Sequence, residues 1–236
     1  NSFKIIKKIE KFHIKFSKKH KKAKIVLCVP NTLLSSFKKK IGSKTILLGA
    51  QNCSQHEKQG PFTGSVSASM IKNAGAEFVI LGHSENRSDG ETPNLIKKKI
   101  ESALKENLNI IFCVGETASE KKRGKTFSIL KNQINKSLEK KFNFDKIIVA
   151  YEPVWSIGTG KIPEQYDIYK VGSFLKKALR EKFKTKKRPK ILYGGSVNGK
   201  NIKKISTGSS HIDGFLIGGA SQSSKKFIDI IKNYYK

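Results

Sequence analysis

The chain has 236 residues and a formal net charge of +30 at pH 7. This length allows one large domain with a well-buried core, and α/β barrels are commonly built as a single unit of this size. No apolar run approaches the roughly 18 residues that span a membrane. The first residues alternate charged and apolar side chains, so we also expect no signal peptide and no membrane partner.

The three cysteines are odd in number and lack the spacing of a metal site. Cys28 and Cys113 lie inside the apolar runs IVLCVP and NIIFCVG, and Cys53 is the third. This pattern favours free, buried thiols over disulfides, and it is typical of a reducing compartment. We therefore expect a cytoplasmic protein.

The positive charge comes almost entirely from lysine, because only four of the basic residues are arginines. Proteins that read bases or phosphates rely on the planar fork of arginine, and the lysines here are spread over nearly every segment predicted to be helical. We interpret the charge as a solvated, lysine-rich surface with no specific nucleic-acid partner. A weak attraction for anionic substrates follows in any case.

Strand-like and helix-like segments alternate along the chain. The opening stretch SFKIIKKIEKFHIKF resembles a helix, and further amphipathic helices are predicted over 93–107 and over 163–183, where Pro163 is a first-turn signal. Continuous apolar runs predict buried parallel strands. Seven such runs occur, at 25–30, 45–51, 77–84, 109–116, 146–153, 190–197 and 214–221. The rhythm has no break or linker, so we expect one domain over residues 1–236.

Polar residues or Gly-Gly pairs stand at the carboxyl end of each predicted strand. In chain order they are Asn31, Gln51 and Asn52, His83 to Glu85, Glu116, Glu152, Ser196, and Gly218 with Gly219. Barrel enzymes place their active sites at this end of the strands. An open doubly wound sheet binds ligands at the same ends, but at a switch point fed by fewer strands.

Glu152 follows the fifth predicted strand in the segment YEPVWSIGTGK (151–161). A carboxylate at the end of an apolar strand is partly desolvated, which makes it a usable base. Pro153 and Trp155 stiffen the start of the following segment, and Gly158 and Gly160 give it backbone freedom, as in a mobile lid. The alternative is a Glu that caps the next helix behind a Gly-rich turn.

His83 in LGHSE occupies a similar position after the third predicted strand. A lone histidine is commonly a structural residue. Beside Glu85, and across from a carboxylate at another strand end, a role in proton transfer competes with that interpretation.

Two glycine pairs, in YGGS (193–196) and IGGAS (217–221), follow the last two predicted strands. Glycine lets backbone N–H groups approach an anion closely. In barrels, the loops after the last two strands frequently form a phosphate site. Both pairs together therefore indicate phosphate binding.

These motifs together resemble the triosephosphate isomerase family, in order and with matching spacing over almost the whole chain. The segments that carry the resemblance are GAQN (49–52), GPFTG (60–64), LGHSE (81–85), CVGET (113–117), YEPVWSIGTG (151–160), YGGSV (193–197) and GFLIGGAS (214–221). The resemblance implies a (β/α)₈ TIM barrel that interconverts dihydroxyacetone phosphate and glyceraldehyde 3-phosphate through an enediolate, in glycolysis and gluconeogenesis. It implies a homodimer that associates through the 60–64 loop. It also implies that the reaction requires neither a metal nor a cofactor.

The resemblance also assigns roles to residues of this chain. It implies that Glu152 moves the proton between two carbons and that His83, as a neutral imidazole, polarises the carbonyl. Gly158, Ser196, Gly218 and Gly219 would hold the phosphate. Glu85, Trp155 and Thr159 would support the reacting groups and the lid that closes over the substrate.

Several positions depart from the family's pattern. The family's first strand ends in an Asn-x-Lys element, and we find neither that strand nor its lysine in the sequence. We therefore expect a barrel with strand 1 absent, poor folding and low activity. Ser156 stands where the family usually has Ala. Ser65 and Asn86 replace a Glu and an Arg that are thought to pair across the dimer, which weakens the expected dimer.

Other interpretations remain open from the sequence alone. Another phosphosugar barrel, such as an aldolase or an indole-type synthase, shares the phosphate grip, but a Schiff-base aldolase needs a strand-end lysine that none of the seven runs shows. A basic nucleic-acid binder would want Arg and aromatic residues on one face. A catalytically dead scaffold is the third alternative.

Overall fold

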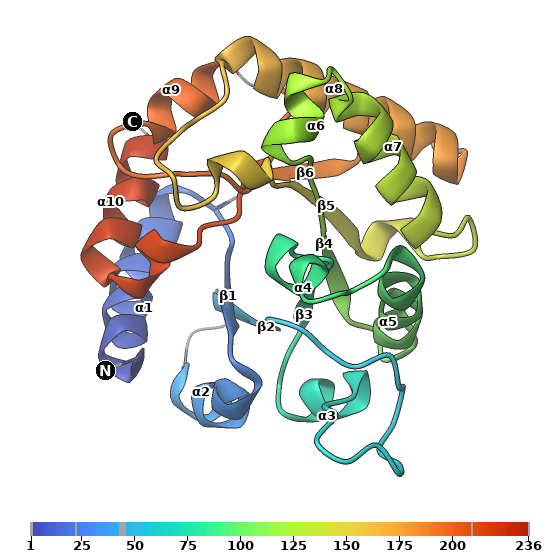
Figure 1. Ribbon diagram of the computed structural model, residues 1–236. Helices are drawn as coiled ribbons and strands as arrows, with labels where there is room; N and C mark the ends of the chain where they lie inside the picture. Colours follow the sequence, from blue (N-terminus) through green and yellow to red (C-terminus); the bar gives the residue numbers. More distant parts are fainter. Residues whose placement is uncertain (1, 22, 43–45, 209, 236) are drawn as a thin grey trace.

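A computed structural model of the chain describes residues 2–21, 23–42, 46–208 and 210–235. Within these residues, seven strands form one parallel sheet whose spatial order is the chain order, and Figure 1 shows this sheet curling with the helices outside it. The strands are β1 (Ile25–Val29), β2 (Ile46–Ala50), β3 (Phe78–Leu81), β4 (Asn109–Val114), β5 (Ile147–Tyr151), β6 (Lys190–Tyr193) and β7 (Gly214–Phe215).

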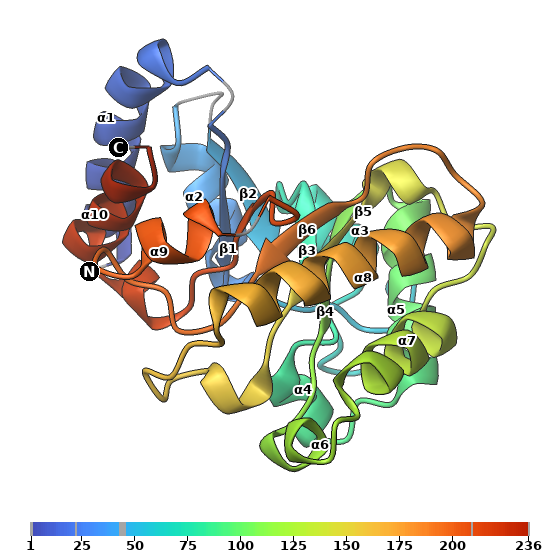
Figure 2. The ribbon, with the colours of Figure 1, turned by 90° about the horizontal axis from the view of Figure 1, so that it is seen from above.

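Helices α2 to α9 lie between successive strands, α1 precedes β1 and α10 follows β7, and the helices cover the convex face of the sheet, as the two perpendicular views show (Figures 1 and 2). The α-helices are α1 (Ser2–Lys19), α2 (Leu34–Lys40), α3 (Ala68–Asn73), α4 (Ser84–Ser88), α5 (Pro93–Lys105), α6 (Ala118–Lys122), α7 (Thr126–Ser137), α8 (Gln165–Phe183), α9 (Ile202–Thr207) and α10 (Ser224–Tyr234). Short 3-10 helices are η1 (Asn31–Leu33), η2 (Phe144–Lys146), η3 (Val154–Ser156) and η4 (Gly219–Gln222).

The strands are apolar over most of their length because both of their faces are covered. Along β4, Ile110 and Phe112 belong to the large core shared with the helices. Ile111 and Cys113 belong to a small apolar cluster on the opposite face. This alternation follows from the two-residue period of a strand, and it explains why the sequence shows continuous apolar runs instead of an alternating pattern.

The two edges of the sheet lie at β1 and β7. Within the described residues β1 pairs only with β2, and β7 pairs only with β6. Helices α1 and α10 lie side by side next to these edges (Figures 1 and 2). The ends of the sheet are therefore bridged by a helix pair.

The seven predicted strands and the opening helix are confirmed. Thr45, which begins the second predicted strand, lies outside the described residues. The strand predicted over 214–221 is wrong in length, because only Gly214 and Phe215 pair and the chain then turns into η4. Pro163 is not the first residue of α8, which begins at Gln165 with Glu164 as its N-cap.

Two further expectations bear on the surface and the thiols. The cysteines are free; Cys53 and Cys113 are buried, and Cys28 is half-buried. Burial raises the pKa of both the Cys28 and the Cys53 thiols to about 12, so these groups are inert near neutral pH. Among the helices that the structure describes, none is both long and apolar enough to cross a membrane.

Candidate active site

The carboxyl ends of β5, β6 and β7 lie level with one another. Tyr151 is in register with Tyr193, and Tyr193 is in register with Phe215. The N–H of Gly194 donates to the carbonyl of Tyr151 (2.8 Å), just beyond the paired residues. Because Glu152 directly follows Tyr151, it lies beside the first glycine pair, Gly194 and Gly195, which follows Tyr193.

The backbone around Glu152 fixes this carboxylate closely. Glu152 is 3 % exposed, and its N–H donates to the carbonyl of Val114 (2.8 Å). A Cβ at Gly115 would lie 1.7 Å from the backbone oxygen of Glu152, and a Cβ at Gly194 would lie 2.9 Å from its Cγ. Only glycine fits at these two neighbours, so the position of Glu152 depends on the close approach of three strand ends.

His83 lies between β3 and α4, where its side chain caps the helix. The backbone N–H of Glu85 donates to His83 Nδ1 (3.3 Å), and His83 Nε2 lies 3.2 Å from Glu152 Oε1. A ring nitrogen that accepts a hydrogen bond carries no proton, so this network assigns a neutral imidazole with its proton on Nε2. The Glu85 carboxylate lies farther away, 3.7 Å from Nδ1, and is largely exposed.

The contact between these two groups changes the acidity of the histidine. The hydrogen bond to Glu152 raises the pKa of His83 above its usual value, although burial opposes that effect. Among the described residues, the second carboxylate oxygen, Glu152 Oε2, is buried and has no hydrogen-bond partner. The pair therefore has one oxygen engaged by the imidazole and one oxygen free to take a proton.

Arg87 supports this pair, although the sequence motifs do not single it out. Its Nε donates to the carbonyl of Gly82 (2.7 Å), and its Nη2 donates to the carbonyl of Cys113 (3.0 Å). It thereby ties the residue before His83 to the end of β4. The basic residues of this chain are nearly all lysines. An arginine four residues after the motif histidine is therefore the sequence feature that could have indicated the role of Arg87.

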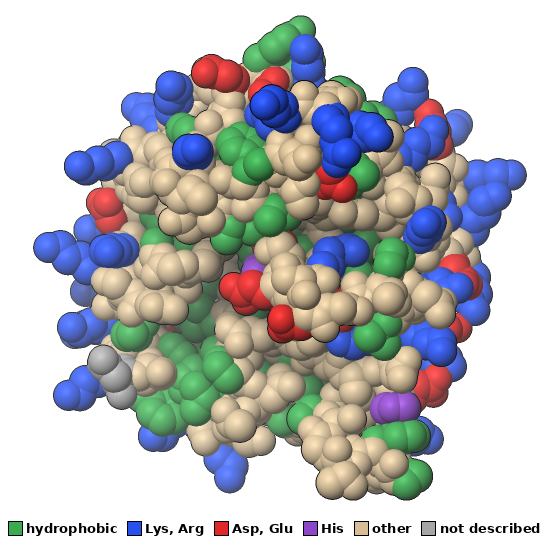
Figure 3. Space-filling model, viewed as in Figure 1, with side chains coloured by type: hydrophobic (Ala, Val, Ile, Leu, Met, Phe, Trp, Pro, Cys, Tyr) green, Lys and Arg blue, Asp and Glu red, His purple; other side chains and the backbone are tan. Residues whose placement is uncertain are grey.

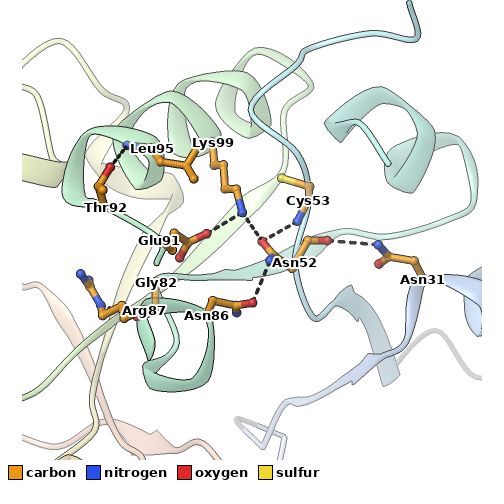
Figure 4. Close-up of polar contacts among 10 residues, drawn as sticks. All are labelled: Asn31, Asn52, Cys53, Gly82, Asn86, Arg87, Glu91, Thr92, Leu95 and Lys99. Atoms are coloured by element: carbon orange, nitrogen blue, oxygen red, sulfur yellow. Dashed lines mark hydrogen bonds and ion pairs between the residues drawn. The ribbon is translucent and has the colours of Figure 1, made fainter. Parts of the chain in front are cut away.

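A buried polar network lies beside Arg87 (Figure 4). Lys99 Nζ lies 2.5 Å from Glu91 Oε1 and donates to Asn52 Oδ1 (3.1 Å). Asn52 in turn donates through Nδ2 to Asn86 Oδ1 (3.1 Å), and Asn31 donates to the Asn52 carbonyl (3.4 Å). The network joins the segments after β1, β2 and β3, and it fixes the helix that His83 caps.

The segment after Glu152, residues 153–161, is called the lid below. Trp155 is held at its start, because the indole N–H donates to Glu116 Oε1 (3.0 Å). The Tyr151 hydroxyl donates to the same oxygen (3.1 Å), and Glu116 is fully buried. In the sequence, Glu116 is marked only as a polar residue at the end of a strand. In the structure it anchors the lid.

The far part of the lid contacts the loop after β6. Gly160 N–H donates to Ser196 Oγ (3.1 Å), and Ser196 Oγ donates to the carbonyl of Ser156 (2.6 Å). Thr159 Oγ1 bonds back to the carbonyl of Trp155 (3.0 Å). Gly158 and Gly160 have φ of 69° and 77°, the left-handed region that favours glycine, so the tight turn of the lid depends on them.

The second glycine pair follows β7 and begins η4. A Cβ built at Gly218 or at Gly219 would meet nothing within 4 Å, so open space lies beside both residues. Small, uncovered backbone at the end of a parallel sheet is suited to an anionic group. Figure 3 shows lysine and arginine side chains over much of this face and around its outline, whereas the hollow near its middle is bordered by apolar and other uncharged atoms, with acidic side chains and a histidine beside it.

The structure thus brings His83 and Glu152 into contact, and it places Trp155, Gly158 and Thr159 in the lid. Ser196 touches that lid, and Gly218 with Gly219 stands at the end of the neighbouring strand. Parallel strands that curl inside a layer of helices, and that gather their polar groups at the carboxyl ends, define an enzyme of the (β/α)₈-barrel class.

Comparisons with known proteins identify the family within this class. The family model for triosephosphate isomerase matches residues 2–234. A triosephosphate isomerase from Bradyrhizobium is 42 % identical over 215 residues, which are 89 % of this chain and 84 % of the relative. One from Dictyoglomus thermophilum is 40 % identical, covering 93 % of this chain and 90 % of the relative.

A solved structure leads to the same conclusion. The crystal structure of triosephosphate isomerase from Bartonella henselae aligns with a TM-score of 0.82 at 37 % identity, over 90 % of this chain and 86 % of that one. The chain therefore belongs to the triosephosphate isomerase family, and it is an intramolecular isomerase.

Proposed function

We propose that the protein interconverts dihydroxyacetone phosphate and D-glyceraldehyde 3-phosphate. The observation that carries the proposal is the contact between His83 Nε2 and Glu152 Oε1 at 3.2 Å, with the other carboxylate oxygen buried and unpartnered among the described residues. Aldose–ketose isomerisation needs a base that removes a proton beside a carbonyl and a donor that polarises the carbonyl oxygen. The pair supplies both groups.

In the proposed reaction, Glu152 takes the proton from the hydroxymethyl carbon of the ketose, and the C–H electrons form the enediolate double bond. The proton on His83 Nε2 stabilises the oxygen that gains charge, and it moves between the two oxygens. Glu152 then returns its proton to the neighbouring carbon, which yields the aldose. Atoms and electrons balance without any co-reactant.

The lid and the glycine pairs would bind the phosphate and exclude water. Gly158, Gly218 and Gly219 are exposed residues with open space beside them, so their backbone, together with Ser196, is suited to the phosphate oxygens. The contacts of Ser196 with Gly160 and Ser156 then link phosphate binding to lid closure. Excluding water protects an enediolate from losing its phosphate.

The test is a coupled assay of isomerase activity on the 236-residue chain, with Glu152→Gln as its partner variant. Gln keeps the size of the side chain and removes the base, so we expect activity that falls about 10³-fold in the variant. Equal activity in the two proteins would reject the role of Glu152, and no activity in either would reject the proposed function of this chain.

A homodimer through the 60–64 loop is the proposed assembly. Phe62 at the centre of this loop is 39 % exposed and stacks on His56, with ring centroids 3.3 Å apart. An exposed aromatic residue on a projecting loop is suited to a pocket on a second copy. Ser65 and Asn86 supply no charge pair for that contact. Sedimentation should show a concentration-dependent dimer that Phe62→Asp abolishes; a monomer at all concentrations would contradict it.

A further inference from the structure

Ser156 is fully buried in the lid, whose other residues apart from Pro153 are half-buried or exposed. It ends η3 within the lid, and the four residues that follow it, 157–160, are half-buried or exposed. A buried hydroxyl must be hydrogen-bonded, or it costs free energy. Its partners therefore show what the residue does.

The hydroxyl of Ser156 connects three parts of the site. It donates to the carbonyl of Lys161 at the far end of the lid (2.5 Å) and lies 3.3 Å from the Tyr193 hydroxyl at the end of β6. It also accepts from the N–H of Ser196 (3.4 Å). The two ends of the lid are thus joined to each other and to the β6 loop through one oxygen.

The space around this oxygen is closely filled. A Cβ added at Gly195 would lie 2.7 Å from Ser156 Oγ and 2.1 Å from Tyr193 Oη. The two hydroxyls therefore sit directly against the glycine pair that is proposed to bind phosphate. Movement of the lid away from β6 would break the contacts of the Ser156 hydroxyl with the Tyr193 hydroxyl and with the Ser196 N–H, whereas the contact with the Lys161 carbonyl lies within the lid.

We propose that Ser156 is a positioning residue that latches the lid against the β6 loop and so sets the rate of lid opening. This inference rests on the proposed function for its effect on turnover, because lid opening releases the product. The latch itself is a property of the lid and does not depend on which substrate binds.

Ser156→Ala isolates the hydroxyl. The variant loses the contacts to Lys161, Tyr193 and Ser196 N–H, but keeps the backbone contact in which Ser196 Oγ donates to the carbonyl of residue 156. Ser128→Ala is the matched control, because Ser128 is an exposed residue of α7 whose hydroxyl donates to the carbonyl of Lys125, the N-cap of that helix.

The lid carries its own probe, since Trp155 is the single tryptophan of the chain. Temperature-jump relaxation of its fluorescence, in the presence of inorganic phosphate, measures lid opening and closing directly. We expect opening to be about three- to tenfold faster in Ser156→Ala and unchanged in Ser128→Ala, as the loss of a hydrogen bond predicts. Unchanged relaxation in Ser156→Ala would overturn the proposal.

Hydrogen exchange without any ligand gives a second reading. The amide of Gly160 should exchange about three- to tenfold faster in Ser156→Ala, whereas amides in β4 and β5 should not change. Tyr193→Phe should also speed exchange, and its effect should be smaller in the Ser156→Ala background, because the two hydroxyls share one contact. Additive effects of the two variants would contradict that contact.

Steady-state kinetics separates the latch from a general structural role. The latch predicts a KM about three- to tenfold higher with kcat equal or higher in Ser156→Ala, since opening is faster. A lower kcat with unchanged KM would contradict it. If neither the chain nor Glu152→Gln has isomerase activity, the proposed function fails, yet the fluorescence and exchange measurements still decide the latch.

Discussion

Glu152 and the strand ends around it at Gly115 and Gly194 form what is called the floor of the site below. This floor and the lid are built from contacts of different kinds. At the floor, Glu152 is held by neighbouring strand ends so closely that a Cβ at Gly115 would meet its backbone oxygen at 1.7 Å. The lid is held by a few hydrogen bonds, among them those of Trp155 to Glu116 and of Gly160 to Ser196. The floor therefore tolerates no added atom, whereas the lid can release its contacts one by one.

This difference assigns separate tasks to the two regions. Steric close packing fixes the reacting groups within a narrow range of positions, as proton transfer requires. Hydrogen bonds at the surface of a loop contribute little individually, so the lid can open on the time scale of turnover. Changes in the floor should act on stability and kcat, and changes in the lid should act on KM and on opening rates.

The largest expected structural effect is that of Gly115→Ala in the floor. The added methyl overlaps the Glu152 carbonyl, so either β4 or β5 must shift, at a cost of about 3 kcal/mol. Thermal unfolding should show a midpoint lower by about 10 °C, with a matching loss of kcat. Gly124→Ala is the control: its φ is 67° but nothing lies within 4 Å, so it should cost only backbone strain of about 1 kcal/mol. Equal effects of the two variants would contradict a steric floor.

Ser196→Ala tests the lid side of this comparison. It removes the acceptor of Gly160 N–H and the donor to the Ser156 carbonyl, and also one proposed phosphate ligand. We expect KM to rise about tenfold while thermal stability changes by less than about 1 kcal/mol. A large drop in melting temperature with unchanged KM would place Ser196 in the floor instead.

The smallest effect concerns the pH dependence of His83. Its pKa is raised in the folded protein, first by the hydrogen bond to Glu152, so the protonated form is favoured by folding. The associated stability is present below the unfolded pKa of about 6.5 and is lost as the pH rises through the folded pKa. In Glu152→Gln this dependence should flatten. NMR titration of the His83 ring should show a lower pKa in that variant. An unchanged pKa would contradict the hydrogen bond to Glu152 as the cause of the raised pKa of His83.

Much of this arrangement could be predicted from the sequence, because strand ends are marked by where apolar runs stop. Glu152, His83 and the glycine pairs all stand at such points. The length of the last strand could not be predicted in the same way. Leu216 and Ile217 are apolar because they pack against the core, but packing and pairing leave the same pattern in a sequence.

The roles of the supporting residues could not be predicted from the sequence, because those roles depend on tertiary contacts. Arg87 acts on the carbonyl of Cys113, which is 26 residues away, and Lys99 meets Asn52 across 47 residues. Ser156 stands in the sequence only as a small residue where the family usually has Ala, but in the fold it is fully buried and its hydroxyl has three partners. Burial and partners follow from the fold, so a spacing motif does not contain them.

The most direct test of the central claim is deuterium incorporation during turnover in D₂O. The chain is incubated with dihydroxyacetone phosphate and a trapping enzyme for the aldose, and deuterium at carbon 2 of the product is measured by NMR. If Glu152 moves the proton between the carbons, the proton that it carries exchanges in part with solvent before it is returned, so the product gains deuterium at carbon 2, and Glu152→Gln does so about 10³-fold more slowly. Incorporation at the same rate in both proteins would contradict the assignment of Glu152 as the base.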